Sequence, residues 1–274
     1  MVKRVVGLYF SPYGKTAKIT KMILAEIGKQ LREYCVDEIP LEYHDLMTTP
    51  PRDLRGFDSE TVVVVGMPVY SGRIPELCNA LIRQLDGNGA YALELVTYGN
   101  VTYGDALYEL DSYLREQKFQ VISAGAFITE HSMFHRIAET RPDEKDYKKI
   151  VDFSRLSAQK LKRFICTTVE EMRAKPAPLE IPGSLPTKRP ARVPIHPSAN
   201  SYCIQCGTCS KVCPVGAIDP NNPKKVDAKK CISCAACIKA CPQEARGFYG
   251  PLAAASRMAL ERICGKRKEP EWFL

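Results

Sequence analysis

The chain has 274 residues, of which 45% are hydrophobic and 26% charged, an ordinary composition for a globular protein. Its longest apolar run, residues 62–70, is far shorter than the about 20 residues of a membrane-spanning helix. The N-terminus lacks the apolar stretch and cleavage site of a signal peptide, so we expect a cytoplasmic protein without a membrane span. The whole net charge of +8 lies in residues 176–274, which hold 15 basic and 7 acidic side chains.

Strands and helices are predicted to alternate through the first half of the chain. Apolar segments predict strands at residues 3–10, 41–45, 61–66, 93–98 and 121–127. Helical patterns occupy residues 16–33, 75–85, 103–117 and 146–173. This alternation predicts an α/β fold with a doubly wound, five-stranded parallel sheet. The segment 61–66 is apolar on both faces, as a buried central strand should be.

Three loops at the ends of these strands are candidate ligand sites, because such sheets bind ligands beyond the carboxyl ends of their strands. Residues 11–16 precede a helix and suit a phosphate group. They are not a nucleotide-triphosphatase loop, since Tyr9 stands where that motif requires glycine. Residues 68–75 and 98–105 carry glycines and tyrosines suited to enclosing a flat aromatic ligand. Any one of these loops alone is better explained as an ordinary turn, but the convergence of all three on one end of the sheet favours a ligand site.

The second half of the chain divides into a linker, a cysteine-rich region and a C-terminal segment. Residues 176–200 contain seven prolines, which predict an extended and semi-rigid linker after the first domain, residues 1–175. We expect this linker to lay the cysteine-rich region, residues 201–250, across the ligand end of the sheet. Residues 251–274 are expected to form a helix followed by a tail that either docks or stays loose.

Eight of the twelve cysteines form two copies of the pattern C-x2-C-x2-C-x3-C-P, 28 residues apart. This pattern is typical of bacterial ferredoxins, in which three thiolates of one run and the fourth of the other hold each [4Fe–4S] cluster. The expected ligand sets are Cys203, Cys206, Cys209 and Cys241 for one cluster, and Cys231, Cys234, Cys237 and Cys213 for the other. Zinc sites usually use separated pairs, often with histidine, and no histidine lies among these cysteines.

Two clusters change how the positive charge is interpreted. Each [4Fe–4S]2+ core with four thiolates carries a charge of −2, which reduces the formal charge to about +4 and weakens a nucleic-acid interpretation. The lysines of residues 224–230 are then expected to form a solvated face or a docking patch for an acidic redox partner. The other four cysteines have no ligand spacing and are expected to be core or part-buried thiols: Cys35, Cys78, Cys166 and Cys264.

The chain resembles a known family over nearly its full length. The sequence Phe-Ser-Pro-Tyr-Gly-Lys-Thr at residues 10–16 is similar to the phosphate loop of flavodoxins, with Tyr13 in place of a threonine. Residues 68–75 and 98–105 resemble the two flavodoxin loops that enclose the isoalloxazine ring. Together with the cysteine runs, these features resemble the EFR1-type family of fused flavodoxin–ferredoxin proteins. Further similar segments are residues 126–132, 141–143 and 267–270.

This resemblance implies FMN and two [4Fe–4S] clusters as cofactors, and a small α+β ferredoxin-like domain after the sheet. The residues it assigns to the FMN phosphate are Ser11, Tyr13, Gly14, Lys15 and Thr16. The residues it assigns to the flavin ring are Pro68, Val69, Tyr70, Ser71, Gly72, Tyr98, Gly99, Asn100, Tyr103 and Asp105. Asn100 and Asp105 are equally suited to capping the next helix.

The leading functional interpretation is an iron–sulfur flavoprotein that moves electrons between the clusters and FMN and couples one-electron with two-electron partners. One alternative is a flavin-dependent reductase of a small-molecule acceptor, with His131 or Tyr103 as proton donor. Another is a redox-sensing interaction module. The chain has no Gly-x-Gly-x-x-Gly motif for NAD(P)H. The expected partner is a redox protein or a small-molecule acceptor, in a cell that is anaerobic because exposed clusters are oxygen-sensitive.

Overall fold

The computed structural model describes residues 2–32, 39–165, 175–185 and 194–274. Its main element is a six-stranded sheet with the strand order β2-β1-β3-β4-β5-β8. The strands are β1 (Arg4–Tyr9), β2 (Leu41–Asp45), β3 (Thr61–Pro68), β4 (Tyr91–Tyr98), β5 (Gln120–Ile128) and β8 (Glu271–Phe273). Strands β1 to β5 pair in parallel. The order 2-1-3-4-5 is that of the flavodoxin-like fold, whose ligand site lies where the order reverses between β1 and β3.

The sheet has one strand more than the five that the sequence predicts. Residues Glu271–Phe273 form β8, which pairs antiparallel with β5 and places Phe273 opposite Ala124. The preceding residue on β8, Trp272, packs its ring against Phe153 at 6.4 Å between centroids. The prediction left this tail as either docked or loose. Docking is favourable because it covers the edge of β5, which otherwise exposes unpaired backbone groups.

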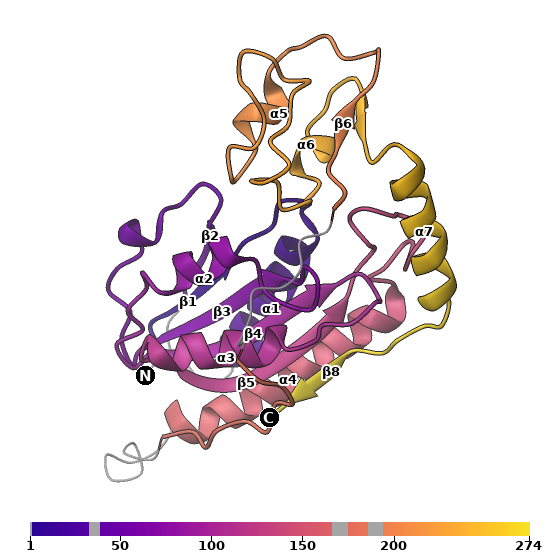
Figure 1. Ribbon diagram of the computed structural model, residues 1–274. Coiled ribbons are helices and arrows are strands. Elements are labelled where there is room, and N and C mark those ends of the chain that lie inside the picture. The colour runs from indigo at the N-terminus through magenta and orange to yellow at the C-terminus, as the bar shows by residue number, and fades with distance from the viewer. Residues whose placement is uncertain (1, 33–38, 166–174, 186–193) are drawn as a thin grey trace.

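Helices cover both faces of the sheet (Figure 1). One face packs against α1 (Lys15–Arg32) and α4 (Glu144–Ile165), and the other against α2 (Glu76–Ile82) and α3 (Ala106–Glu116). The four valines of β3 alternate between these two cores and are all fully buried, which explains why the strand is apolar on both sides. A short 3-10 helix, η1 (Pro51–Asp53), precedes β3.

The cysteine-rich region sits beyond one end of the sheet (Figure 1). It contains β6 (Ser198–Ala199), α5 (Thr208–Lys211), α6 (Ala236–Lys239) and β7 (Arg246–Gly247). Its backbone follows the 28-residue repeat, because left-handed residues recur at equivalent positions. The equivalent pairs are Gln205 with Ser233, Gly207 with Ala235, and Gly216 with Glu244. The repeat seen in the sequence is therefore a repeat of conformation as well.

A last helix, α7 (Pro251–Ile263), connects the cysteine-rich region to the tail that carries β8 (Figure 1). Cys78 and Cys264 are buried, as expected of core thiols, whereas Cys35 and Cys166 lie outside the described residues. Within the described part of the chain, we find no helix with the length and apolarity to cross a bilayer.

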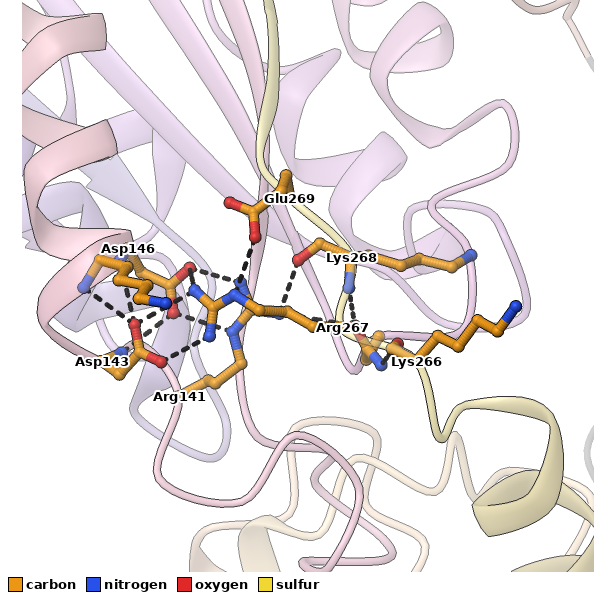
Figure 2. Close-up of polar contacts among 9 residues, drawn as sticks. Arg141, Asp143, Asp146, Lys266, Arg267, Lys268 and Glu269 are labelled. Carbon is orange, nitrogen blue, oxygen red and sulfur yellow. Dashed lines mark hydrogen bonds and ion pairs between the residues drawn. The ribbon is translucent and has the colours of Figure 1, made fainter.

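A polar cluster fastens the tail after α7 to the sheet domain (Figure 2). Arg141, which is buried, donates from Nε to Asp146 Oδ2 at 2.8 Å and makes a second bond to the other oxygen of that carboxylate. The same guanidinium donates to the carbonyl oxygen of Lys268 at 2.8 Å. Arg267 of the tail contacts Asp146 at 3.1 Å and pairs with Asp143. The tail is thus held by charge-assisted bonds to the segment between β5 and α4.

Candidate functional site

A cavity of about 490 Å³ lies at the carboxyl ends of β1, β3 and β4. All three predicted loops reach it, as do the segment after β5, residues of the cysteine-rich region and one side of α7. Twelve of the predicted site residues line it: Ser11, Tyr13, Lys15, Thr16, Pro68, Val69, Tyr70, Ser71, Gly72, Tyr98, Gly99 and His131. The fold therefore brings together predicted residues that lie as far apart in the sequence as Ser11 and His131.

The loop before α1 has the geometry that an anion would require. Its turn is closed by the bond from the Gly14 amide to the Ser11 carbonyl, with Gly14 in the left-handed region at φ +88°. The Ser11 hydroxyl accepts from the Ala17 amide at 2.9 Å, and the Thr16 hydroxyl lies 2.7 Å from that of Thr97. The first amides of α1 have no acceptor within the helix, and the helix dipole makes this end positive. These groups fit a phosphate.

Lys15 is not a free cation beside this loop. Its Nζ lies 3.0 Å from Glu130 Oε2, and His135 Nδ1 lies 2.7 Å from the other carboxylate oxygen. Burial alone would raise the pKa of Glu130, but hydrogen bonds from Lys15 and His135 lower it below its ordinary value. The ring of Tyr13 stacks on that of His135 at 5.5 Å between centroids. A phosphate at this loop would therefore be held mainly by backbone amides and hydroxyls.

The second and third loops pack closely because two glycines meet between them. Gly104 is left-handed, at φ +53°, and a Cβ there would stand 2.6 Å from the Gly72 carbonyl oxygen. The second loop is a tight turn in which Tyr70 and Arg73 exchange backbone hydrogen bonds of 2.8 and 3.2 Å. Tyr98, at the end of β4, has its pKa raised by burial to about 12. These aromatic side chains provide an apolar wall suited to a flat ring.

His131 is positioned by the close approach of Gly99. A Cβ at Gly99 would stand 2.8 Å from the His131 Cα and 2.6 Å from its Cδ2. The His131 Nδ1 accepts from the amides of Met133 and Phe134, at 3.2 and 3.3 Å, so the neutral ring carries its proton on Nε2. Burial lowers the pKa of His131 to about 4. At neutral pH the imidazole is therefore a hydrogen-bond donor rather than a charged acid.

Four predicted site residues lie outside the lining of the cavity: Gly14, Asn100, Tyr103 and Asp105. The Asn100 side chain donates to the carbonyls of Cys264 and Lys266 and accepts from the Lys268 amide, so it holds the tail.

Tyr103 and Asp105 are engaged elsewhere. The Tyr103 hydroxyl donates to Glu271 of β8 at 2.7 Å, and burial together with this bond raises the pKa of the phenol. Asp105 is the N-cap residue of α3, but its side chain makes no capping bond: it lies 3.8 Å from Arg73 and accepts from the Ser184 amide.

The eight repeat cysteines divide between two further small cavities. Cys203, Cys206, Cys209 and Cys241, the outer set, line one of them. Cys213, Cys231, Cys234 and Cys237, the inner set, line the other. The division is the three-plus-one exchange between the two runs that the spacing predicts. Backbone amides point at the sulfurs at equivalent positions, from Ala217 to Cys213 Sγ at 3.2 Å and from Ala245 to Cys241 Sγ at 3.3 Å. Four thiols with amide donors fit a [4Fe–4S] cluster.

The two sets differ in their exposure. Within the inner set, burial raises the pKa of Cys234 to about 12 and that of Cys237 to about 11. In the outer set Cys206 is exposed, and Tyr202 and Ile204 beside it are 75% and 63% exposed. The outer set therefore includes the one exposed thiol of the eight, Cys206, whereas Cys209 of the same set is as buried as Cys234 and Cys237 of the inner set.

The inner set adjoins the large cavity at the end of the sheet. Ile232 lines both the inner-set cavity and the large cavity, and Ser233 lines the latter. Tyr70 is near enough to Cys234 for the charge of that thiolate to add to the effect of burial in raising the phenol's pKa. The three cavities thus follow one another from the solvent to the sheet.

Several lining residues escaped prediction because no local motif marks them. They come from the segment after β5, from residues 194–195, from the second cysteine run and from α7, and include Thr129, Phe134, Ile195, Ile232 and Leu260. The advance signals were general: residues 126–132, which include Thr129, resemble the flavodoxin–ferredoxin family, and the linker was expected to lay the cysteine-rich region across this end of the sheet.

Comparisons with known proteins agree with this division of the chain. Residues 202–246 match the family model described as 4Fe-4S dicluster domain. No curated protein matches the chain significantly.

Solved structures that resemble the sheet domain include three flavoproteins by title. A flavodoxin from the domain Archaea has 15% identity and a TM-score of 0.41, covering 58% of this chain and 99% of its own. Oxidised flavodoxin 1 from Bacillus cereus has 20% identity and a TM-score of 0.41, covering 57% and 97%. An apo NADH:FMN oxidoreductase, EmoB, has 21% identity and a TM-score of 0.39, covering 57% and 90%. The flavodoxin-like assignment rests on the strand order, because these scores are low.

Proposed function

We propose that this chain, as an EFR1-type flavodoxin–ferredoxin fusion, is an electron-transfer protein that carries FMN and two [4Fe–4S] clusters. Ser11, Thr16 and the first amides of α1 would hold the FMN phosphate, and the loops at residues 68–75 and 98–105 would enclose its ring. The outer and inner cysteine sets would each hold one cluster. When bound, the clusters exchange single electrons and FMN exchanges one or two, which lets the chain couple one-electron with two-electron partners.

The single observation that best supports this proposal is the position of Ile232. Its side chain contributes to the wall of the inner-set cavity and to the wall of the large cavity. The proposed cluster site and the proposed flavin site therefore share a wall residue. An arrangement that served only to bind the two cofactors independently would not need this contact.

The surface around the outer cysteine set suits an acidic redox protein as partner. Lys211 lies close enough to Cys206 for its charge to contribute to lowering the pKa of that thiol, an effect due first to hydrogen bonding by Thr208. Lys224 and Lys225 follow Pro223, which lines the outer-set cavity. Cations in the same region as an exposed redox site are typical of surfaces that steer and bind an acidic electron carrier. We expect electron delivery at this surface to slow as ionic strength rises.

The reductase interpretation receives less support from the proton donors it requires. His131 lines the large cavity, but its pKa of about 4 leaves it uncharged at neutral pH. Tyr103 lies outside the cavity lining and is bonded to Glu271. Because the efficiency of a general acid is greatest when its pKa is near the working pH, neither group is well suited to protonating a substrate over the flavin.

The composition of anaerobically purified protein tests the proposal. We expect one FMN and eight irons per chain, measured by identifying the released flavin and by iron analysis. Eight irons without flavin would overturn the assignment of the large cavity, and four irons would overturn the assignment of two clusters.

A further inference from the structure

The imidazole of His131 is held in place from several sides. Its Nδ1 accepts from the amides of Met133 and Phe134, and its ring stacks on that of Phe134 at 5.5 Å between centroids. The Cδ2 edge of the ring lies against Gly99, where a Cβ would stand 2.6 Å away. The backbone is fixed as well, since the His131 amide donates to the carbonyl oxygen of Ile137 at 3.1 Å. The ring therefore has little freedom to turn.

The Nε2–H of this histidine is an unused hydrogen-bond donor. Because Nδ1 accepts two hydrogen bonds, the neutral ring carries its proton on Nε2. Burial lowers the pKa of His131 to about 4, so the ring is neutral at neutral pH. The Nε2–H has no hydrogen-bond partner among the described residues. The edge formed by Cε1 and Nε2 is the part of the ring left to face the large cavity, which His131 lines.

The place of His131 in this cavity favours the flavin ring over the flavin phosphate as its partner. Gly99, which it touches, follows Tyr98 in one of the two loops that we propose enclose the ring. The phosphate loop has a different neighbour after β5, since Lys15 pairs with Glu130. The acceptors of a flavin ring, its carbonyl oxygens and ring nitrogens, lie along the pyrimidine edge. A few fixed polar groups of this kind orient a ligand in an otherwise apolar cavity.

We propose that the Nε2–H of His131 donates a hydrogen bond to the pyrimidine edge of the bound FMN ring. The inference rests on the proposed function, since it requires FMN in the large cavity. It gives the histidine a binding role in place of the proton-donor role that the reductase interpretation requires. A donor already fixed by its own loop is preorganised, so it orients the ring with little cost for ordering the side chain. Without this bond, the ligand would shut the donor off from water unpaired, which is unfavourable.

Two substitutions separate the roles of the two ring nitrogens. In His131→Asn the side-chain oxygen can still accept from the amides of Met133 and Phe134, but no group reaches the position of Nε2. In His131→Gln the side-chain amide reaches near the position of Nε2 and keeps a donor there. His44→Asn is the matched control, because His44 lies on β2, outside the lining of the cavity.

The experiment uses the full-length protein with its clusters intact and its flavin removed, under anaerobic conditions. We expect the dissociation constant for added FMN to rise about 5- to 10-fold in His131→Asn, as the loss of one hydrogen bond would cause. In His131→Gln it should stay within about threefold of wild type. Infrared difference spectra with isotope-labelled FMN should show a C=O or C=N band of the ring displaced in His131→Asn and restored towards its wild-type position in His131→Gln. His44→Asn should match the wild type in both measurements.

Wild-type flavin bands in His131→Asn would overturn the proposal even if FMN bound more weakly, because a displaced loop alone would also weaken binding. Wild-type affinity in that variant would overturn it too, as would equal displacement of the bands in both variants, since glutamine retains the donor. If His131→Asn does not assemble eight irons, His131→Ser takes its place, because the serine hydroxyl can also accept from the two amides. Failure of the proposed function is distinguishable, since the wild-type chain itself would then bind no FMN.

Discussion

The replacement of Gly99 by alanine should selectively damage the flavin cavity. In the structure a Cβ at this position would stand 2.8 Å from the His131 Cα and 2.6 Å from its Cδ2. Ordinary contacts of this kind begin near 3.4 Å, so the backbone at His131 must retreat by about 0.6 Å. Unlike a flexible side chain, this backbone is held by the pairing of Thr129 with Tyr98 and of His131 with Ile137. The strain therefore falls on the cavity wall.

The expected magnitude follows from the cost of overpacking, typically about 1–3 kcal/mol. If the wall relaxes by moving, the same energy appears as weaker binding, and each 1.4 kcal/mol is a factor of about ten. We therefore expect the dissociation constant for FMN to rise by about 5- to 150-fold in Gly99→Ala. The assay is the quenching of FMN fluorescence during titration with flavin-free protein under anaerobic conditions.

Gly265→Ala is the matched control for this substitution. A Cβ there would meet the carbonyl oxygen of Glu261 at 3.7 Å, an ordinary contact, and Gly265 is not among the residues with positive φ. We expect FMN affinity in Gly265→Ala to equal that of the wild type. Wild-type affinity in Gly99→Ala, with its iron content intact, would refute the assignment of this cavity to FMN.

Three further substitutions test other parts of the structure. Arg141→Ala leaves the carboxylate of Asp146 buried without its main partner, and should destabilise the sheet domain by about 3 kcal/mol in urea unfolding; an unchanged midpoint would contradict a stabilising role for the Arg141–Asp146 pair. Asp143 has its pKa held well below the usual range by an arginine hydrogen bond, so it stabilises the fold above the ordinary carboxyl pKa of about 3.9 and loses that effect as the pH falls below it. Asp143→Asn should be less stable at neutral pH and lose less stability on acidification, whereas a parallel pH profile would contradict this. Cys206→Ala should lower the iron content from eight towards four per chain, while Cys264→Ser should leave it unchanged, and equal iron in both would contradict the ligand sets.

The parts of the molecule that sequence predicts best are those in which local spacing determines the geometry. The strand positions follow from apolar runs such as residues 61–66, and the exchange of Cys213 and Cys241 between the sets follows from the repeat. The phosphate loop is likewise local, because Ser11 to Thr16 must form one turn before a helix.

The remainder depends on contacts between distant segments. Asn100 follows a strand at the ligand end, as a flavin ligand would, yet its side chain bonds residues about 165 positions later in the tail. In the same way, the Tyr103 hydroxyl donates a hydrogen bond to Glu271 in β8. No spacing within residues 98–105 reveals these partners, since they are set by the docking of β8 on β5. The positions of Ile232 and Leu260 in the cavity wall could not be predicted from local sequence either, because they too depend on contacts between distant segments.

The central claim is that electrons pass between the cysteine-rich region and the flavin cavity within one chain. The most direct measurement mixes anaerobic holoprotein with a one-electron reductant and follows the cluster and flavin absorbances by stopped flow. We predict that the clusters bleach first, and that the flavin is then reduced at a rate independent of protein concentration. A flavin reduction rate proportional to protein concentration, or a flavin that stays oxidised while the clusters are reduced, would contradict the account.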